Sequence, residues 1–498
     1  MPIALASDLL RHPPAGVAVP AYDRAAVGIG IAHFGVGNFH RVHEAVYVDR
    51  ALHRPGNEEW GIVGIGISDG PAARAKAALF AEQDCLYSVT EFSPDGTTTQ
   101  RVIGSIVRYL HAPQDPEAVL EQLSDPALRI VSMTITEGGY LLDEASGRFL
   151  VEHPDVVRDL TEPLPRGVFG YLVRALARRR AAGIAPFTVI SCDNLRRNGD
   201  TAKRAVVAFA AELDPELASW IESTVAFPNS MVDRIAPYVS SVDRDRLDAA
   251  SGLDDAIPAM SESYLQWVIE DCFPSGRPAL EQVGVELRND VALFETVKGR
   301  MLNASHVLLA YAALLLGHRY VHDALADPQI RGLIETYMTL DAIPLLQGPV
   351  GVSLEEYRDL IVDRFANPAV GDQLIRIATD GSAKIPVFHS ATIRELLDRG
   401  ADVRREAFLL ACYRRYLGGV DDLGGTIDVT EPTLSEEDRL EIDAPDGLGL
   451  LRIGAFASLR LADFPDFAAT FLTVSRMLET SGTAAAIDMV LAPAGAHT

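Results

Sequence analysis

The chain has 498 residues, 48% of them hydrophobic, and its formal net charge at pH 7 is −25. The length predicts two or three domains at roughly 150 residues each, and the hydrophobic content excludes a mainly disordered chain. The acidic balance argues against nucleic acid or an anionic membrane as a partner, because phosphate groups require clustered Lys and Arg side chains.

The cysteines are too far apart for a zinc-type pair or a disulfide framework, which predicts a reducing compartment and no metal; they are Cys85, Cys192, Cys272 and Cys412. Residues 1–14 lack the basic start and apolar core of a signal peptide. The longest strongly apolar run, residues 307–316, is about half of the ~20 residues that a membrane span requires. We therefore expect a cytoplasmic protein that does not cross a membrane.

Residues 27–52 predict a strand that ends near Phe34, a tight glycine turn and a helix that begins near His40. In this setting of a dinucleotide fingerprint, Gly35 allows the turn and Gly37 lets the backbone approach a pyrophosphate. His40 replaces the third glycine of the pattern, so the spacing alone leaves nucleotide binding and a purely structural turn equally open. The residues predicted to contact the cofactor here are Gly35, Val36, Gly37, Asn38 and Phe39.

Residues 60–69 form the next predicted strand, a continuous apolar run typical of a parallel sheet that is covered on both faces. The strand ends in Asp69, whose carboxylate would accept hydrogen bonds from the ribose hydroxyls and repel a 2′-phosphate, which favours NAD over NADP. The alternative is that Asp69 only caps the segment of residues 70–80. Ser68 adds no second negative charge, so incomplete exclusion of NADP is expected.

Residues 85–109 alternate apolar and polar side chains around a turn at residues 94–96, which predicts a β-hairpin inserted in the same sheet. A buried strand is expected at residues 130–135, followed by Thr136 and Glu137. Ligands of doubly wound sheets bind beyond the carboxyl ends of the strands. Thr136 and Glu137 are therefore predicted to line the nicotinamide end of the site.

An amphipathic helix at residues 168–182 precedes a strand whose carboxyl end carries Asp193 and Asn194. By the same rule Asn194 can point into the site and donate a hydrogen bond to a carbonyl or alkoxide oxygen. Asn at the end of a strand is also ordinary turn chemistry, so both interpretations remain open.

Asp233 is flanked by apolar residues and needs a partner, for which His306 and the neighbouring Arg234 are alternatives. Residues 240–262 are acidic and rich in small side chains, which predicts a mobile connection or surface excursion.

Helical patterns dominate beyond about residue 290. We therefore predict an α/β protein, with a Rossmann-type doubly wound sheet in residues 1–288 and a mainly α-helical domain in residues 289–498. Within the helical domain, Arg376 and Lys384 are predicted to flank a loop in residues 378–386, where Gly381 and Pro386 are typical helix breakers. Cations on a loop are usually solvated, but in so acidic a chain these two could orient substrate hydroxyls.

A helix is predicted for residues 295–306, at the start of the second domain. At about 100° per residue, Lys298 and His306 fall within roughly an 80° arc, and Asn303 lies about 60° further round. The helix continues into an apolar run, so Lys298 should be largely buried and its pKa lowered from about 10.4 toward the range of a proton-transfer group. The alternative is that these residues form a solvated surface.

A nucleotide-binding first half, a helical second half and this polar helix between them suggest hydride transfer in an interdomain cleft without a metal. A neutral Lys298 amine can accept the proton of an alcohol as hydride leaves, and the ammonium can return it in the reverse reaction. Asn194 and Asn303 would donate hydrogen bonds to the developing oxyanion.

Six short motifs between Gly35 and His306 carry these residues: GVGNFHRVH from Gly35, TITEGGY from Thr134, CDN from Cys192, FPNSMVDRI from Phe227, QWVIED from Gln266 and KGRMLNASH from Lys298. Their combination resembles the polyol-specific long-chain dehydrogenases/reductases, the family of mannitol 2-dehydrogenase. The Lys-x(4)-Asn-x(2)-His spacing of the last motif is the most specific feature.

The resemblance implies that Lys298 is the catalytic acid/base and that Asn194 and Asn303 bind the oxyanion. It implies that four further side chains contact or orient the polyol, namely Asp233, His306, Arg376 and Lys384. Members of the family typically work without a metal and often as monomers.

The activity implied is the NAD-dependent interconversion of D-mannitol and D-fructose. Another polyol or keto sugar, such as D-arabinitol, D-sorbitol or fructuronate, fits the same chemistry, and Arg376 does not decide because it could pair with the carboxylate of a hexuronate. The alternative of a different class is a non-catalytic NAD-sensing protein that kept the fold.

Overall fold

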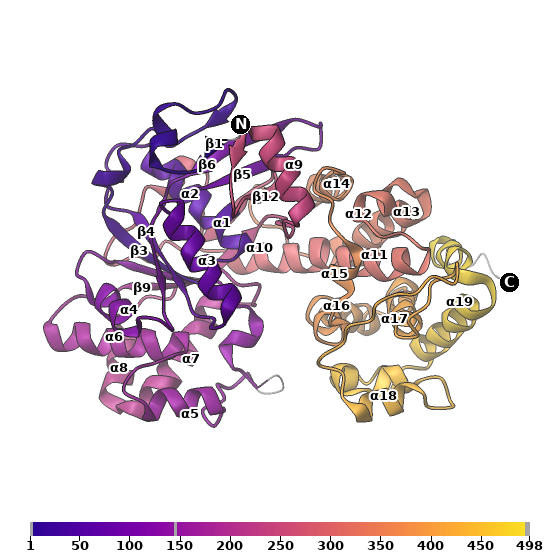
Figure 1. Ribbon diagram of the computed structural model, residues 1–498. Helices are drawn as coiled ribbons and strands as arrows, with labels where there is room; N and C mark the ends of the chain where they lie inside the picture. Colours follow the sequence, from indigo (N-terminus) through magenta and orange to yellow (C-terminus); the bar gives the residue numbers. More distant parts are fainter. Residues whose placement is uncertain (1–2, 144–146, 494–498) are drawn as a thin grey trace. The chain divides into compact units, whose positions relative to one another are not determined.

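A computed structural model describes residues 3–143 and 147–493. The chain folds as two compact units, Met1–Ala292 and Leu293–Thr498, which follow one another along the colour scale of Figure 1.

A five-stranded parallel sheet forms the centre of the first unit, with the strand order β7-β4-β3-β8-β9. Its strands are β3 (Ile29–Phe34), β4 (Gly61–Gly66), β7 (Ile106–His111), β8 (Ile130–Met133) and β9 (Thr188–Ser191). The order reverses beside β3, because the chain first builds outward through β4 to β7 and then continues on the other side of β3 with β8. This is the doubly wound Rossmann arrangement, and it confirms the predicted fold class of this half.

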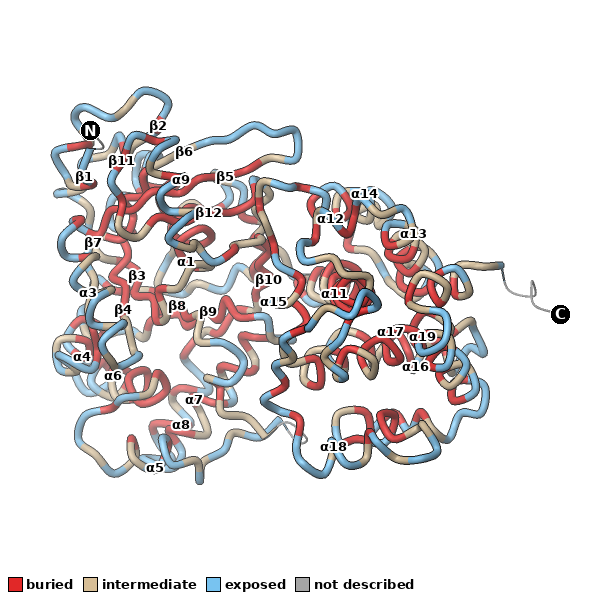
Figure 2. The backbone as a smooth tube through the Cα atoms, turned by 45° about the vertical axis from the view of Figure 1, so that its right-hand side comes forward, coloured by how far each residue is buried: buried red, intermediate tan, exposed pale blue. Residues whose placement is uncertain are grey.

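Both faces of this sheet are covered by apolar side chains, as the continuous apolar strands predicted. One cluster joins Val63 and Val131 to residues of α4 (Pro116–Ser124), α6 (Val168–Ala182) and α7 (Asn198–Leu213). A second cluster joins Ile62 and Ile130 to residues of α2 (Glu44–Leu52). Strands β3, β4, β8 and β9 are accordingly buried along nearly their whole length (Figure 2), whereas the edge strand β7 is partly exposed.

The predicted hairpin exists, but its place in the fold was predicted wrongly. Strands β5 (Tyr87–Phe92) and β6 (Thr98–Ile103) pair antiparallel and belong to a separate four-stranded sheet of order β12-β5-β6-β2, with β2 at Val17–Ala18. Their neighbours β2 and β12 come from distant parts of the chain, so local alternation could not identify the sheet to which the hairpin belongs.

Residues 240–262 are ordered, which corrects the predicted mobile connection. Helix α9 (Ser241–Ser251) begins at a capping box formed by Ser240 and Asp243. Strand β12 (Ala259–Glu262) is buried and pairs parallel with β5. The composition suggested a loop because small side chains are common in loops, but here they form a buried strand whose partner lies about 170 residues earlier.

The remaining elements of the first unit extend these layers. They are β1 (Ile3–Ala4), α1 (Asn38–Val42), α3 (Pro71–Glu82), α5 (Pro154–Thr161), α8 (Pro215–Thr224), β10 (Ser230–Asp233), β11 (Leu253–Asp254), β13 (Gln266–Ile269) and β14 (Glu286–Leu287). Strands β10, β13 and β14 form a three-stranded sheet, and β1 pairs with β11.

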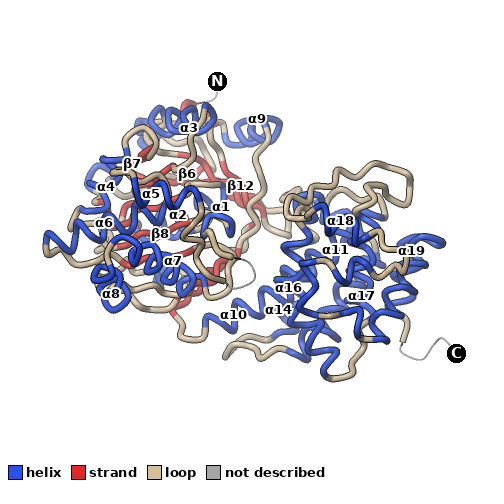
Figure 3. The backbone as a smooth tube through the Cα atoms, turned by 90° about the horizontal axis from the view of Figure 1, so that it is seen from below, coloured by secondary structure: helices blue, strands red, loops and turns tan. Residues whose placement is uncertain are grey.

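The second unit is helical in its described part, as predicted, and Figure 3 shows it as blue helices joined by loops. Its α-helices, apart from α10 at the junction of the units (Val291–Val297), are α11 (Ala304–Leu315), α12 (Val321–Ala326), α13 (Pro328–Thr336), α14 (Leu354–Phe365), α15 (Leu374–Ala378), α16 (Gly381–Asp398), α17 (Arg404–Tyr416), α18 (Glu436–Ile442) and α19 (Pro465–Leu491). Two π-helical segments, η5 (Lys298–Asn303) and η6 (Tyr337–Ala342), interrupt this pattern. Within residues 3–143 and 147–493, none of the helices combines the length and apolarity needed to cross a membrane.

Candidate active site

The glycine turn lies at the carboxyl end of β3, beside the point where the strand order reverses. Gly35 has a φ of +89°, and a Cβ added there would lie 2.0 Å from the carbonyl oxygen of Thr134 at the end of β8. Both the backbone conformation and the lack of space therefore require glycine. In open α/β sheets, ligands bind at this reversal beyond the carboxyl ends of the strands.

The backbone next to this turn leaves room for a ligand. Helix α1 begins at Asn38, two residues earlier than predicted, and Gly37 precedes it. Among the described residues, a Cβ added at Gly37 would have only the carbonyl oxygen of Gly35 within 4 Å, at 3.8 Å. A pyrophosphate could approach this backbone closely, so the turn fits a dinucleotide.

The other residues predicted to contact the cofactor have protein partners as well. Val36 is buried in the apolar core. The side chain of Asn38 accepts a hydrogen bond from Arg41 (2.6 Å), and the ring of Phe39 stacks on that of His43 at 4.8 Å between centroids. These contacts stabilise the first turn of α1. They do not test the predicted roles in cofactor binding.

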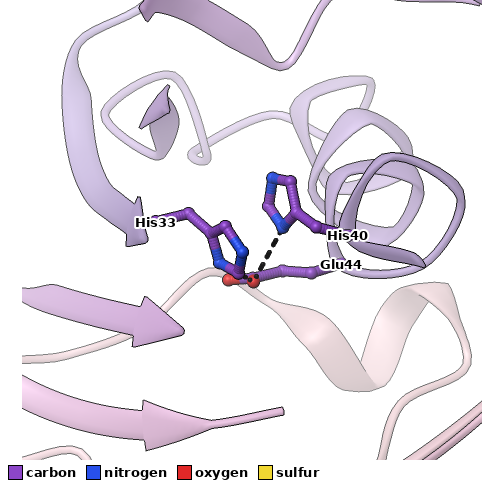
Figure 4. A group of neighbouring side chains, drawn as sticks. All are labelled: His33, His40 and Glu44. Atoms are coloured by element: carbon purple, nitrogen blue, oxygen red, sulfur yellow. Dashed lines mark ion pairs between the residues drawn. The ribbon is translucent and has the colours of Figure 1, made fainter. Parts of the chain in front are cut away.

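His40, which replaces the third glycine of the fingerprint, stacks on the ring of His33 in β3 with 3.4 Å between the ring centroids and 15° between the planes. Figure 4 shows the two rings above Glu44. Oε2 of Glu44 lies 3.0 Å from Nδ1 of His33 and 3.3 Å from Nδ1 of His40, and it accepts a hydrogen bond from Ser132 (2.9 Å). A flat pair of imidazoles thus replaces the close packing of helix on strand that a glycine usually provides.

These three side chains are close enough together to be considered as metal ligands, since one candidate ligand atom from each lies within 4.8 Å of the others. A metal ion binds an imidazole nitrogen in the plane of the ring, at about 2.0–2.1 Å for zinc. Two nearly parallel rings 3.4 Å apart cannot both direct a nitrogen lone pair at one ion. The arrangement instead fits a buried polar cluster in which the Glu44 carboxylate faces both imidazoles.

The charges of this cluster follow from its burial. Burial lowers the pKa of His40 to about 3. Burial alone would raise the pKa of Glu44, but the contacts with His33 and His40 outweigh it and hold that pKa below its usual range. Nε2 of His33 lies 3.0 Å from the hydroxyl of Thr134 and 3.3 Å from the carbonyl oxygen of Gly35, so the cluster directly supports the glycine turn. The sequence did not identify His33, because no local pattern shows that a histidine within a strand supports a neighbouring turn.

Asp69 follows β4 by three residues and precedes α3. Its Oδ1 accepts a hydrogen bond from the backbone N–H of Gly70 (2.6 Å) and lies 2.6 Å from Nη1 of Arg74. The carboxylate is therefore bound at the start of α3, as the capping alternative suggested, yet its side chain is 69% exposed. Lys76, also on α3, donates to the carbonyl oxygen of Val36 in the glycine turn, and burial lowers its pKa to about 8. Sequence analysis did not identify Lys76, because its contact depends on how α3 packs.

Glu137 and Asn194 lie at the same edge of the sheet, because they follow the neighbouring strands β8 and β9, whose ends Met133 and Ser191 are paired. Both side chains are exposed. Asp193 holds the segment between β8 and Glu137, since its carboxylate accepts hydrogen bonds from the backbone N–H groups of Ile135 (3.1 Å) and Thr136 (2.9 Å). The sequence placed Asp193 at a strand end but gave no reason to assign it this supporting role.

Asp233 ends β10 and is 3% exposed. The ion pair that the structure records for Arg234 is with Glu91 of β5, at 2.5 Å. For His306, the recorded charged neighbour is Asp372 of its own unit, as described below. Both residues considered as partners of Asp233 thus have further contacts of their own, and the role of Asp233 in binding substrate stays a prediction.

In the second unit, Lys298 is 7% exposed, as expected for a residue on a largely buried helix. The prediction of one regular helix over residues 295–306 was wrong in one respect. The segment passes from α10 into η5 at Lys298 and into α11 at Ala304. A π-helix pairs residue i with residue i+5 instead of i+4, so the arc calculated at about 100° per residue does not apply. Residues 298 and 303 are instead stacked one turn apart.

Two more of the predicted residues, His306 and Arg376, are gathered around Asp372, just before α15. Nε2 of His306 lies 3.6 Å from Oδ2 of Asp372, and its ring stacks on that of Phe365 at 4.3 Å between centroids. The guanidinium of Arg376 donates to both oxygens of Asp372 at 2.7 Å. Burial lowers the pKa of His306 to about 4, so its imidazole is neutral at pH 7.

The prediction of a loop between Arg376 and Lys384 was wrong in its extent. Arg376 lies in α15 and Lys384 in α16, and only residues 379–380 separate the two helices. Pro386, taken as a breaker, lies inside α16. Nζ of Lys384 donates to the carbonyl oxygen of Ile377 (3.2 Å), a favourable position for a cation at the carboxyl end of a helix. Sequence analysis missed Asp372 and Phe365, which organise this group.

The strand order, the glycine turn at its reversal and the buried Lys298 define a Rossmann-type protein of the dehydrogenase class. The sequence profile of the mannitol dehydrogenase Rossmann domain matches residues 29–282, and that of the mannitol dehydrogenase C-terminal domain matches residues 290–471. The chain belongs to the mannitol dehydrogenase family of oxidoreductases, as the motifs predicted.

Individual relatives agree with this assignment. The polyol:NADP oxidoreductase of Gluconobacter oxydans (strain 621H) is 47% identical over 96% of this chain and 99% of its own length. The crystal structure of a substrate-free D-sorbitol dehydrogenase is 46% identical, with a TM-score of 0.89 over 97% of this chain and 100% of that chain. The mannitol 2-dehydrogenase of Pseudomonas fluorescens, in a ternary complex with NAD and D-mannitol, is 39% identical, with a TM-score of 0.90 over 98% of this chain and 99% of that chain.

Proposed function

We propose that the protein is an NAD-dependent mannitol 2-dehydrogenase that interconverts D-mannitol and D-fructose without a metal. The observation that carries the proposal is the setting of Lys298, which is 7% exposed on a continuous helical stretch that also bears Asn303 and His306. Lys is almost never fully buried unless it is paired, and a buried amine among polar groups is a candidate for proton transfer.

In this proposal NAD, when bound, accepts the hydride from C2 of the polyol. The amine of Lys298 takes the proton of the C2 hydroxyl, so one hydride and one proton leave and a carbonyl forms. The carboxamides of Asn194 and Asn303 donate hydrogen bonds to the oxygen as its charge develops. In the reverse reaction the Lys298 ammonium returns the proton to the alkoxide.

The remaining polar residues position the polyol. We assign hydroxyl contacts to His306, Arg376 and Lys384, and a further one to Asp233. The neutral imidazole of His306 can donate or accept a hydrogen bond. Arg376 is held in place by Asp372 at 2.7 Å, so its guanidinium is already oriented before substrate arrives.

The proposed cofactor site uses the glycine turn with Gly35, Val36, Gly37, Asn38 and Phe39, together with Asp69 and Glu137. NAD is favoured over NADP because Asp69 presents an exposed carboxylate after the second strand. Arg74 lies 2.6 Å from that carboxylate and supplies a positive charge that could pair with a 2′-phosphate. We therefore expect the exclusion of NADP to be incomplete.

We also propose residues 1–288 as the dinucleotide-binding domain and residues 289–498 as the helical substrate domain. The protein is proposed to act as a cytoplasmic monomer. Size-exclusion chromatography with light scattering tests the monomer.

A second candidate is the same chemistry on a different polyol. The 46% identity to a D-sorbitol dehydrogenase and the 47% identity to a polyol:NADP oxidoreductase favour it. The binding groups do not discriminate strongly, because guanidinium, ammonium and imidazole groups can each bind hydroxyls of several stereochemistries.

The test is a panel of D-mannitol, D-sorbitol, D-arabinitol, D-fructose and fructuronate, each with NAD or NADP, followed at the NAD(P)H absorbance band. D-Mannitol with NAD, and D-fructose with NADH, should give the highest kcat/KM. Higher values with D-sorbitol would support the second candidate. No turnover across the panel, with NAD still bound, would indicate a non-catalytic NAD-sensing protein.

The mechanism is tested with Lys298→Ala. Turnover should fall by at least about 10³-fold, near the upper part of the usual contribution of a general base, while NADH binding measured by fluorescence titration remains. Lys203→Ala, on α7 of the first unit, serves as the control and should keep wild-type turnover. Full activity of Lys298→Ala would refute the mechanism.

A further inference from the structure

The π-helical segment η5 contains both Lys298 and Asn303. In a regular α-helix, five steps of about 100° would place these side chains about 140° apart. Pairing of residue i with residue i+5 instead stacks them one turn apart, on nearly the same side of the helix. Segments of this kind are rare and are frequently found at functional sites, so we expect specific contacts that hold η5.

Side chains distant in the sequence supply these contacts within the second unit. Arg300, in the middle of η5, donates from Nε to the hydroxyl of Thr392 (2.9 Å) and forms an ion pair with Glu395 (2.9 Å), both on α16. The hydroxyl of Tyr337 donates to the carbonyl oxygen of Arg300 (3.1 Å). Tyr337 itself begins η6, so the two π-helical segments contact each other.

A buried histidine binds the backbone where η5 returns to α-helix. Nε2 of His389, on α16, lies 3.1 Å from the carbonyl oxygen of Ala304, and its Nδ1 lies 2.9 Å from Oε2 of Glu406 on α17. His389 and Glu406 are each 1% exposed. One imidazole thus joins α16, α17 and the start of α11, directly after η5.

The two hydrogen-bond partners of His389 determine which of its ring nitrogens carry a hydrogen. A carbonyl oxygen can only accept, so Nε2 must carry a hydrogen. If Glu406 is ionised, Nδ1 carries a second hydrogen; if Glu406 is protonated, it donates to Nδ1. Facing this pair are Tyr337, whose ring centroid lies 5.6 Å from that of His389, and the ion pair of Asp341 with Arg405.

We propose that His389 and Glu406 are positioning residues of the reaction. By binding the carbonyl group of Ala304 they fix the register in which η5 stacks Lys298 and Asn303, so that the amine and the carboxamide reach the same substrate oxygen. Without this donor, the extra residue of the π-helical turn can move along the helix and rotate Lys298 away from Asn303. This proposal rests on the proposed function, because the proposed function assigns Lys298 and Asn303 their catalytic roles.

The first test is the steady-state kinetics of His389→Ala and His389→Gln. His389→Ala should lower kcat by about 10–100-fold, because displacement of a catalytic group by about 1 Å can cost this much, and should leave the KM for NAD unchanged. His389→Gln, whose amide can reach the same carbonyl oxygen, should recover most of the rate. Equal losses in the two variants, or wild-type kcat in His389→Ala, would overturn the proposal.

The second test is the pH profile of kcat/KM, which a purely structural residue would not move. In His389→Ala and Glu406→Gln, the apparent pKa assigned to Lys298 should shift, because its surroundings change. Asp421→Asn is the matched control: it alters a buried carboxylate of the same unit, bonded to Arg319 (2.7 Å) and to the backbone N–H of Gly425 (2.6 Å). It should lower thermal stability without moving the profile. Lower stability with an unmoved profile in all three variants would contradict positioning.

If His389→Ala does not fold, Glu406→Gln and His389→Gln decide, because both keep roughly the original size: the first removes the carboxyl group that bonds to His389, and the second keeps a donor for the carbonyl oxygen of Ala304. Their crystal structures should show a loosened or shifted π-helical turn in Glu406→Gln and an intact one in His389→Gln. Lys298→Ala distinguishes failure of the proposed function from failure of the positioning role. Turnover in that variant refutes the proposed function, whereas an inactive Lys298→Ala beside fully active His389 and Glu406 variants refutes only the positioning role.

Discussion

The glycine turn of the first unit and the π-helical segment of the second unit are both short motifs with defined spacing, but they are maintained in different ways. Gly35 is required by its own φ of +89° and by the carbonyl group of the next strand in the sheet. Segment η5 depends on Tyr337, Thr392 and His389, which lie 37 to 92 residues from their partners. One motif is therefore largely determined by local backbone geometry, and the other by tertiary contacts.

The two regions also differ in their buried charges. The first unit places two stacked imidazoles on a carboxylate, and burial suppresses the protonation of His40. The second unit places His306 beside Asp372, which is already paired with Arg376. The first group supports a backbone turn, whereas the second presents groups suited to bind hydroxyls. The following substitutions test this difference, beginning with the largest expected effect.

Gly35→Ala should disrupt the first region most strongly. The backbone conformation alone costs about 1–3 kcal/mol for a residue with a side chain, and the Cβ would overlap the carbonyl group of Thr134. NAD binding, measured by calorimetry, should weaken by about 100-fold or more. Gly37→Ala, where the nearest atom is 3.8 Å away, should keep the fold and lose only affinity. Normal NAD binding in Gly35→Ala would show that the turn is not the cofactor site.

Asn303→Ala should affect the second region without affecting the first. Loss of one preorganised donor should lower kcat by about 10²–10³-fold, while the KM for NAD stays the same. Stopped-flow measurement of NADH formation gives the rate of the chemical step. Ser305→Ala removes a hydroxyl on the same helix that bonds to the carbonyl oxygen of Leu302 (3.2 Å), and this control should stay within about threefold of wild type. Equal effects of the two substitutions would remove the special role of Asn303.

Both units should lose stability in acid because of buried imidazoles. Burial lowers the pKa of His43 in the first unit and of His306 in the second unit to about 4 each, whereas an unfolded histidine titrates near 6.5. Between these values the unfolded chain binds more protons, so the stabilisation is complete above about pH 6.5 and is lost as the pH falls toward 4. Each group can contribute up to about 3 kcal/mol.

Guanidinium denaturation at pH 7.5, 6.0 and 5.0 measures this loss. His43→Asn and His306→Asn should each flatten the pH dependence, while His12→Asn, at an exposed position, should leave it unchanged. If the stability of the wild-type protein were constant from pH 7.5 to 5.0, the burial of these imidazoles would have no energetic consequence.

Asp69→Ala should have the smallest effect. One hydrogen bond contributes about 0.5–1.5 kcal/mol net, so the preference for NAD over NADP should fall by about tenfold. Activity with NADP should then depend on Arg74, which Asp69 no longer pairs. The double variant Asp69→Ala/Arg74→Ala should lose the gain with NADP. A stronger preference for NAD in Asp69→Ala would exclude the proposed ribose contact.

Much of the first unit could be predicted from local patterns. The predicted strand over residues 130–135 appears as β8, and the helix predicted for residues 168–182 matches α6 at both ends. The errors share one cause, since residues 240–262 and the hairpin of β5 and β6 depend on pairing with distant strands. In the second unit, a loop was expected at residues 378–386 because Gly381 and Pro386 usually break helices, but Gly381 begins α16 and Pro386 lies inside it.

The sequence by itself determined the Rossmann-type and helical halves, the family, and the positions of Lys298, Asn303 and Gly35, because hydrophobic periodicity and short-range spacing encode these features directly. Only the tertiary structure revealed the imidazole stack of His33 and His40, the grouping of His306 and Arg376 around Asp372, and the π-helical turn held by His389. Such features arise when side chains remote in sequence compete with regular backbone hydrogen bonding. The energies of that competition are set by burial and packing, which no local pattern contains.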